Sequence, residues 1–195
     1  MNREERMENR MNLRERILEA AIDIINEKSY KFTMDEVAKR IEISKKTIYT
    51  VFPDKESLFL ETVDYCFLKI KESERQIIEN PDLDIVEKIR KVLIVLPGRF
   101  EGLDFRQIYK LKEKAPRIYQ KIEKRIENEW EPSIALIEEG IKLGKIKPMT
   151  IVILKTMIEA SMEHFIGNRV LIENEISYAE ALDKMMDIIM QGIVC

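Results

Sequence analysis

Helical spacing of apolar residues between well-separated prolines is the feature that most constrains this chain. Apolar side chains recur every three or four positions along most of the sequence, and prolines interrupt the pattern at 53, 81, 97, 116, 132 and 148. Proline is tolerated in the first turn of a helix but breaks its interior, so these positions predict helix boundaries. We find no alternating strand pattern and only six glycines. The sequence therefore predicts an all-α fold.

The composition excludes several classes of protein. The 195 residues are 45% hydrophobic and 35% charged, which suits a compact globular chain rather than a disordered one. Only two cysteines occur, Cys66 and Cys195, so a disulfide scaffold is excluded. Residues 1–10 lack the apolar core of a signal peptide, and charges interrupt the apolar stretch 151–166. We therefore expect a cytoplasmic protein with no membrane segment.

Three helix starts are predicted from capping residues near the N-terminus. A first helix over 12–28 is followed by Thr33 and Glu36, which have the spacing of a capping box. Ser44 is the next N-cap and opens a short helix from Lys45 to Val51. Asp54 caps a third start, from which helical spacing runs unbroken to about Asn80.

Two short helices joined by the segment 42–44 form a helix-turn-helix arrangement, a common DNA-binding motif. Its second helix, the recognition helix, has a polar face that includes Lys45, Lys46 and Tyr49, whereas Ile48 and Phe52 are expected to pack inward. Residues 28–55 carry seven Lys or Arg and four acids, a net charge of +3, although the whole chain carries −3. A basic island in an acidic chain favours local contact with phosphate.

The run Ser44-Lys-Lys-Thr-Ile-Tyr-Thr-Val-Phe52, followed by Lys55-Glu-Ser-Leu58, resembles the signature of the tetracycline-repressor (TetR) family of bacterial transcription regulators. The resemblance covers residues 12–60, and Val51 stands where the family usually has an aromatic residue. It implies that Thr33, Ser44, Tyr49 and Lys55 bind DNA phosphates. It further implies that Lys45, Lys46, Thr47 and Thr50 face the bases.

The rest of the chain resembles this family only in its helical pattern. We expect further helices over about 84–96, 103–114, 117–143, 150–167 and 178–193, with 117–143 kinked or split at Pro132 and its frayed end marked by Gly140 and Gly144. The domain division is then a charged extension (1–11), a helix-turn-helix domain (12–57) and a ligand-binding and dimerisation domain (58–195). The extension is predicted to lengthen the first helix.

The resemblance implies a small-molecule effector and a homodimer. Large apolar side chains on helices often line pockets, although most belong to an ordinary core. The candidate pocket residues are Phe67, Ile70, Phe100, Phe105, Tyr109, Tyr119, Trp130, Met157 and Phe165. The last two helices have broader apolar faces than one small core can use, which favours pairing across a twofold axis. The candidate interface residues are Ile158, Met162, Leu182, Met185, Met186, Ile189 and Ile193.

The predicted function is that of a DNA-binding regulator, a repressor that its effector releases from a palindromic operator. Two alternatives remain: a transcriptional activator of the same family, and a helical ligand-binding or interaction module without DNA binding. The helix 54–80 is expected to be the only element that reaches both sites. An enzyme is not expected, because the single His164 has no partner at metal-ligand spacing and no phosphate-binding loop follows a strand. No cofactor or metal is expected.

Overall fold

The computed structural model describes residues 3–97, 110–128, 130–167 and 169–195. Within these ranges the chain is helical, and the only strand-like pairing is an isolated antiparallel bridge between Ile146 and Val194. The predicted all-α fold is confirmed. No helix in the described part of the chain is both long enough and apolar enough to cross a membrane.

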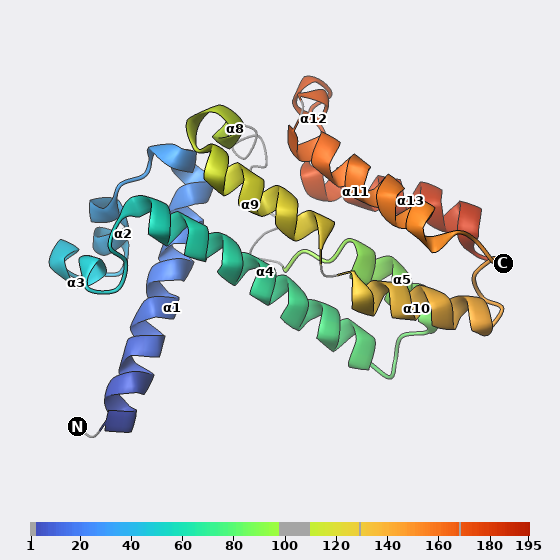
Figure 1. Cartoon of the computed structure of the whole chain (residues 1–195), viewed down its shortest axis with the longest axis horizontal. Helices are drawn as coiled ribbons and strands as arrows, with labels where there is room; N and C mark the ends of the chain where they lie inside the picture. Colours follow the sequence, from blue (N-terminus) through green and yellow to red (C-terminus); the bar gives the residue numbers. More distant parts are fainter. Residues whose placement is uncertain (1–2, 98–109, 129, 168) are drawn as a thin grey trace.

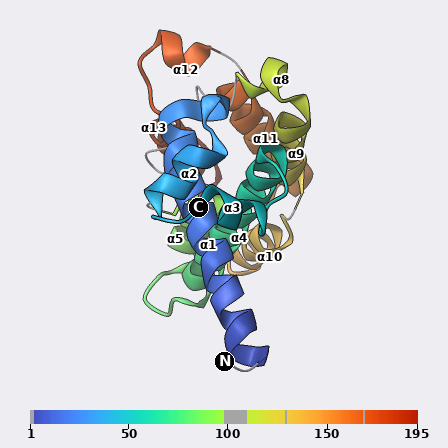
Figure 2. The same ribbon diagram turned by 90° about the vertical axis from the view of Figure 1, so that its left-hand side faces the viewer.

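The N-terminal region is a small helical unit at one end of the molecule, and Figure 2 looks onto this end with α2 and α3 beside α1. Its elements are α1 (Arg3–Lys28), the 3₁₀ turn η1 (Ser29–Lys31), α2 (Met34–Arg40), α3 (Lys45–Tyr49) and the start of α4 (Lys55–Glu79). Because α1 begins at Arg3, the N-terminal extension continues this helix as expected.

The three predicted caps are confirmed. Thr33 and Glu36 form a reciprocal capping box at the start of α2. The Thr47 N–H donates to the Ser44 hydroxyl, and the Ser57 N–H donates to the Asp54 carboxylate. These bonds satisfy amides that have no partner inside the helix, so each start is set by a local side chain.

The remaining helices form the larger part of the molecule, in which α4 and α9 run side by side across the middle (Figure 1). Pro132 falls in the first turn of α10, so the stretch 117–143 is split there as predicted. The expected helix over 103–114 lies mostly outside the described residues. The elements are α5 (Ile85–Leu93), α8 (Leu111–Lys114), α9 (Pro116–Glu127), α10 (Glu131–Lys142), α11 (Ile151–Gly167), α12 (Val170–Glu173) and α13 (Tyr178–Ile193).

The two glycines near the end of α10 differ in role. Gly144 has φ +66°, a conformation that suits glycine, and it follows the helix end as expected. Gly140 is instead buried inside α10, where an added Cβ would lie 2.7 Å from Ile146 Cγ1 and 2.9 Å from Ile89 Cδ1. The expectation that Gly140 marks a frayed end is therefore wrong, because this glycine allows α10 to approach α5 closely.

Buried apolar side chains fall into two clusters. The first joins α1, α2, α3 and α4 to α8, α9 and the start of α13, and includes Phe32, Phe52 and Ile118. The second joins α5, α10, α11 and the rest of α13, and includes Ile89, Ile158 and Met186. The first cluster thus connects the helix-turn-helix unit directly to the larger part of the molecule.

Candidate nucleic-acid interface and ligand cavity

The short helix α3 is held against the core by one face and presents the other to solvent. Ile48 and Phe52 are fully buried, whereas Lys45, Lys46 and Tyr49 are exposed. Two ammonium groups and a phenol therefore project from one short, solvent-facing helix. These side chains can reach phosphates and base edges in a groove of DNA.

The hydroxyl groups of α3 take part in its own structure. Ser44 Oγ accepts from the Thr47 N–H at 3.1 Å and lies 2.7 Å from Thr47 Oγ1. The Thr50 hydroxyl donates to the Thr47 carbonyl at 2.6 Å. Thr33 is similarly engaged, since its hydroxyl donates to Glu36 Oε2 at 3.0 Å. In this state these hydroxyls stabilise helix ends, and DNA contact would require some of them to change partner.

Lys55 points back toward the turn between α1 and α2. Its ammonium donates to the Tyr30 carbonyl and lies 4.2 Å from the centre of the Tyr30 ring and 4.9 Å from that of Phe32. Burial among these groups lowers the pKa of Lys55. The side chain therefore joins the start of α4 to η1, in addition to any contact it makes with phosphate.

The turn of the helix-turn-helix contains a residue with unusual backbone geometry. Glu42 has φ 57°, in the left-handed region where residues other than glycine are uncommon. The Ile43 N–H, which follows it, donates to the Ala38 carbonyl at 3.0 Å. The left-handed residue thus ends α2 and redirects the chain into α3.

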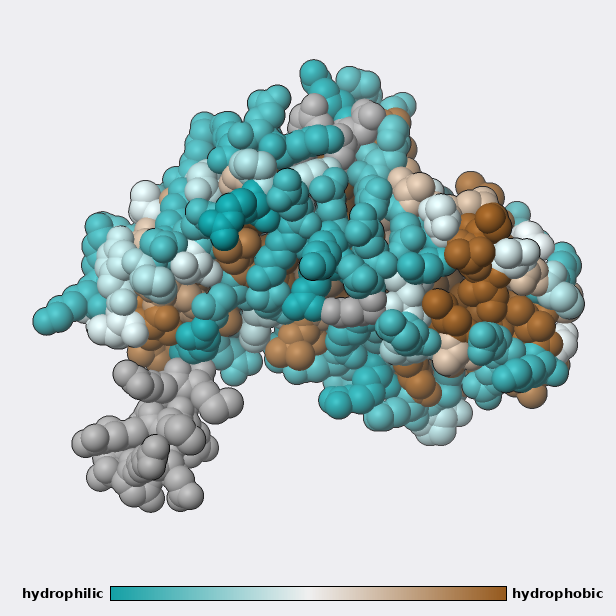
Figure 3. Space-filling model, viewed as in Figure 1, coloured by the Kyte–Doolittle hydropathy of each residue, from teal (hydrophilic) through white to brown (hydrophobic). Residues whose placement is uncertain are grey.

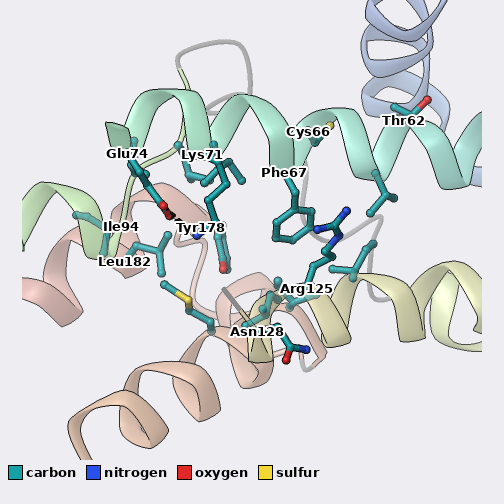
Figure 4. A pocket seen from close by; sticks show the side chains of 18 of the residues that line it. Thr62, Cys66, Phe67, Lys71, Glu74, Ile94, Arg125, Asn128, Tyr178 and Leu182 are labelled. Atoms are coloured by element: carbon teal, nitrogen blue, oxygen red, sulfur yellow. Dashed lines mark hydrogen bonds and ion pairs between the residues drawn. The ribbon is translucent and has the colours of Figure 1, made fainter. Parts of the chain in front are cut away.

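A cavity of about 220 Å³ lies where the two buried clusters meet. Most side chains around it are apolar, and they come from α1, α4, α5, α9, α11 and α13 (Figure 4). Pockets that bind small molecules are typically apolar with a few polar groups. The apolar lining includes Phe59, Phe67, Ile70, Ile126, Trp130 and Met162.

The cavity also has charged groups at two places. On α4, Lys71 Nζ donates to Glu74 Oε2 at 2.8 Å, and Glu74 is buried. On α9, Arg125 faces Phe67, with its guanidinium carbon 5.9 Å from the ring centre (Figure 4). Cys66 also lines the cavity, and burial raises the pKa of its thiol to about 12, so this cysteine is an inert apolar group.

The helix α1 lines the cavity together with α4. Ile22, Ile25 and Asn26 of α1 belong to its wall. The two helices are further joined by an ion pair between Arg14 and Glu61 and by the Tyr65 hydroxyl, which donates to Glu15 at 2.8 Å. The expectation that α4 alone reaches both sites is therefore wrong, because α1 contacts α2 of the helix-turn-helix and also lines the cavity.

Comparisons with known proteins agree with this architecture. The sequence model of "Bacterial regulatory proteins, tetR family" matches residues 17–62. The HTH-type transcriptional regulator YhgD of Bacillus subtilis is 33% identical over 145 residues, which cover 68% of this chain and 71% of that protein. The chain belongs to the TetR family.

Other relatives of this TetR-family regulator match over nearly its whole length. The regulator YvaF of Bacillus subtilis is 26% identical over 91% of this chain and 94% of that protein. A TetR regulator structure from Haloarcula marismortui has a TM-score of 0.71 at 14% identity, over 95% of this chain and all of that one. The FadR regulator of Bacillus subtilis, solved in complex with stearoyl-CoA, has a TM-score of 0.62 at 19% identity, and the match covers 91% of this chain and 98% of that one. These structures share the fold.

The structure of this TetR-family chain brings only some of the predicted pocket residues together. Phe67, Ile70 and Trp130 line the cavity. Tyr119 is buried in the first core cluster away from it, Phe165 packs against that cluster, and Met157 is 56% exposed. Phe100, Phe105 and Tyr109 lie outside the described residues.

The predicted interface residues fall on the inner faces of their helices. Ile158, Leu182 and Met186 are buried in the protomer, so these three side chains are not available to a second chain. Met162 is partly buried and lines the cavity. Met185, Ile189 and Ile193 are partly buried and pack against the core. Apolar spacing predicted these two helices correctly. It did not predict which apolar face is exposed, because α11 and α13 have apolar residues on more than one side.

Several residues that line the cavity were not identified in the sequence analysis. The cavity residues Thr62, Lys71, Glu74 and Arg125 are polar or charged side chains on two amphipathic helices, α4 and α9. A charge at an otherwise apolar helix position is the only available signal, and Glu74 lies within such a pattern. Among the described residues there is no group of His, Cys, Asp or Glu that could hold a metal ion.

Proposed function

We propose that this TetR-family regulator is a repressor that binds a palindromic operator as a homodimer and is released by a small molecule in the cavity. The observation that carries the proposal is the course of α4. Its N-cap, Asp54, follows the recognition helix, and its later residues, from Phe59 to Glu74, form one wall of the cavity. A ligand that shifts α4, or α1 packed beside it, changes the position of the recognition helix.

The exposed face of α3 supports the DNA-binding part of the proposal. Lys45, Lys46, Thr47 and Thr50 are assigned to base edges, and Tyr49, Ser44, Thr33 and Lys55 to phosphates. Since a helix-turn-helix dimer reads one half-site per subunit, the half-sites should lie about one helical turn apart, ~34 Å, or a small multiple of it.

Exposed apolar residues on α11 and α13 support the homodimer. Val152, Ile153 and Met157 are 61%, 58% and 56% exposed, and Ile188 is 74% exposed. An apolar patch is visible at the end of the molecule formed by α10, α11 and α13 (Figure 3). Contiguous apolar surface of this kind favours a partner, and a second copy would cover it symmetrically. This outward face is proposed in place of Ile158, Leu182 and Met186, which are buried in the protomer.

The test is binding to the DNA upstream of the gene that encodes this chain, measured by fluorescence anisotropy against random DNA of equal length. The wild-type protein should prefer the upstream DNA. Lys46→Ala should weaken binding and reduce the difference in affinity between the upstream DNA and the random DNA. Tyr49→Phe should weaken binding to both DNAs alike, because phosphate contacts carry no sequence code.

Two other outcomes have distinct meanings. Failure of the wild-type protein to bind any DNA would favour a helical ligand-binding or interaction module. Specific binding combined with lower transcription after deletion of the gene would identify an activator, whereas higher transcription identifies a repressor.

A further inference from the structure

The edge of the cavity on α9 carries an unequal set of charges. Asp64 of α4 accepts from Lys121 Nζ at 2.5 Å and from Arg125 Nη2 at 2.8 Å, so two cations share one carboxylate. Arg125 is the member of this group that also lines the cavity. At the other charged place, Lys71 and Glu74 balance each other. Among the described residues that line the cavity, the charged side chains are Lys71, Glu74 and Arg125, which together carry one positive charge.

The positive charge lies at the edge of the cavity, where it could meet the charged end of a bound ligand. The side chains of Asp64, Lys121 and Arg125 are 40%, 28% and 32% exposed, so the group lies where the cavity meets solvent. An ion is much less costly to hold there than in the apolar interior. The wall next to Arg125 is apolar, beginning with the Phe67 ring and continuing to Ile126 and Trp130.

We infer that the cavity binds a small amphipathic anion, whose apolar tail fills the interior and whose negatively charged head group pairs with Arg125 in competition with Asp64. The guanidinium of arginine presents a planar fork of donors that matches carboxylate and phosphate groups. The inference rests on the effector-binding role proposed above and names the chemical class of that effector.

The volume of the cavity is sufficient for an alkyl tail. At about 220 Å³ the cavity is larger than the cavity of about 150 Å³ that is known to hold a benzene molecule, so it can take an alkyl tail of several carbon atoms. Affinity should therefore rise with chain length from butanoate to octanoate.

Competition for Arg125 also connects binding to the helix that starts beside α3. Asp64 belongs to α4, and its ion pairs with Lys121 and Arg125 join α4 to α9. An anion that draws Arg125 from Asp64 loosens this connection on α4. The ligand thus acts on the link between the two helices as well as on the apolar wall.

Binding can be measured directly by isothermal titration calorimetry on the full chain, with no operator present. The probes are octanoate, octyl phosphate, 1-octanol and octylamine, which share a tail and differ in head group. Both anions should bind at least about tenfold more tightly than the alcohol, as expected for a charge-assisted hydrogen bond, and the amine should bind least. The tighter anion identifies the head group.

Substitutions at Arg125 and Asp64 should change the affinity for octanoate in opposite directions. Arg125→Gln should weaken binding to the level of 1-octanol, and Arg125→Lys should restore part of it. Asp64→Asn should strengthen binding severalfold, because it removes the competing carboxylate. Lys124→Gln, an exposed neighbour on α9 that does not line the cavity, is the matched control and should leave binding unchanged.

Equal affinities for octanoate and 1-octanol would overturn the inference. So would the failure of both anions to bind, or an Arg125→Gln variant that binds octanoate as tightly as the wild type does. Equal affinity for butanoate and octanoate would contradict the apolar seat for the tail. Failure of the two proposals can be told apart. If octanoate binds in an Arg125-dependent way but does not release the operator, ligand-released repression is contradicted and the anion-binding inference stands. If only cations or neutral molecules release the operator, the anion-binding inference is contradicted and ligand-released repression stands.

Discussion

The Lys55 ammonium lies 4.2 Å from the centre of the Tyr30 ring and donates to the carbonyl of the same residue. One side chain thus joins the first turn of α4 to the 3₁₀ turn after α1. Lys55→Ala should lower the free energy of unfolding by about 1 kcal/mol, the usual range for a cation–π contact.

Urea denaturation measures this change, and Lys46→Ala is the control. Lys46 is exposed on α3, so its loss should alter the free energy of unfolding by less than about 0.5 kcal/mol. A Lys55→Ala variant as stable as Lys46→Ala would show that the contact with Tyr30 does not support the fold.

Glu36 makes the stability of the helix-turn-helix depend on pH. The hydrogen bonds from Lys28 and from the Thr33 N–H and hydroxyl lower the pKa of Glu36 from 4.5 to about 2. Because the pKa is lower in the folded state, this carboxylate stabilises the fold above pH 4.5, and the contribution is lost as the pH falls toward about 2.

A comparison of wild type with Glu36→Gln in urea, from pH 7 to pH 3, tests this dependence. The two should differ most at neutral pH and converge in acid. Glu138→Gln, an exposed carboxylate on α10, is the control. Parallel curves for wild type and Glu36→Gln over the whole range would contradict the assignment.

Gly140 and Gly192 should respond oppositely to alanine. At Gly140 the new Cβ would meet Ile146 and Ile89 at 2.7 and 2.9 Å, and overpacking of this kind costs about 1–3 kcal/mol. At Gly192, in the last turn of α13, nothing lies within 4 Å, so alanine should stabilise by up to about 1 kcal/mol. Thermal unfolding should show melting temperatures shifted in opposite directions. A stabilised Gly140→Ala would mean that α10 and α5 can move apart freely.

Ile188→Asp should dissociate the proposed dimer without unfolding the protomer. Its side chain is 74% exposed, so the charge stays in water in the monomer but would be buried at the interface. Analytical ultracentrifugation should give a monomer with an unchanged helical circular dichroism spectrum. Leu182→Asp, at a buried position, should instead lose helical structure. An intact Ile188→Asp dimer would exclude this face of α13 as the interface.

The local features of the chain could be predicted from the sequence because neighbouring residues produce them. Thr33, Ser44 and Asp54 each accept a hydrogen bond from the amide three positions further on, so their caps were predicted correctly. The split at Pro132 and the inward positions of Ile48 and Phe52 follow from the same short-range geometry. The motif from Ser44 to Leu58 was sufficient to indicate the family.

What the sequence alone determined is therefore most of the longer helices and the surface of α3, and tertiary packing decided the rest. The pairing of Asp64 with Arg125 joins residues 61 positions apart, and α1 reaches the cavity only because it packs beside α4. The packing also turns Ile158 and Met186 inward and leaves Met157 and Ile188 exposed. Helical spacing places residues on faces, but burial of a face depends on which helix covers it, and that is settled by contacts far apart in the chain.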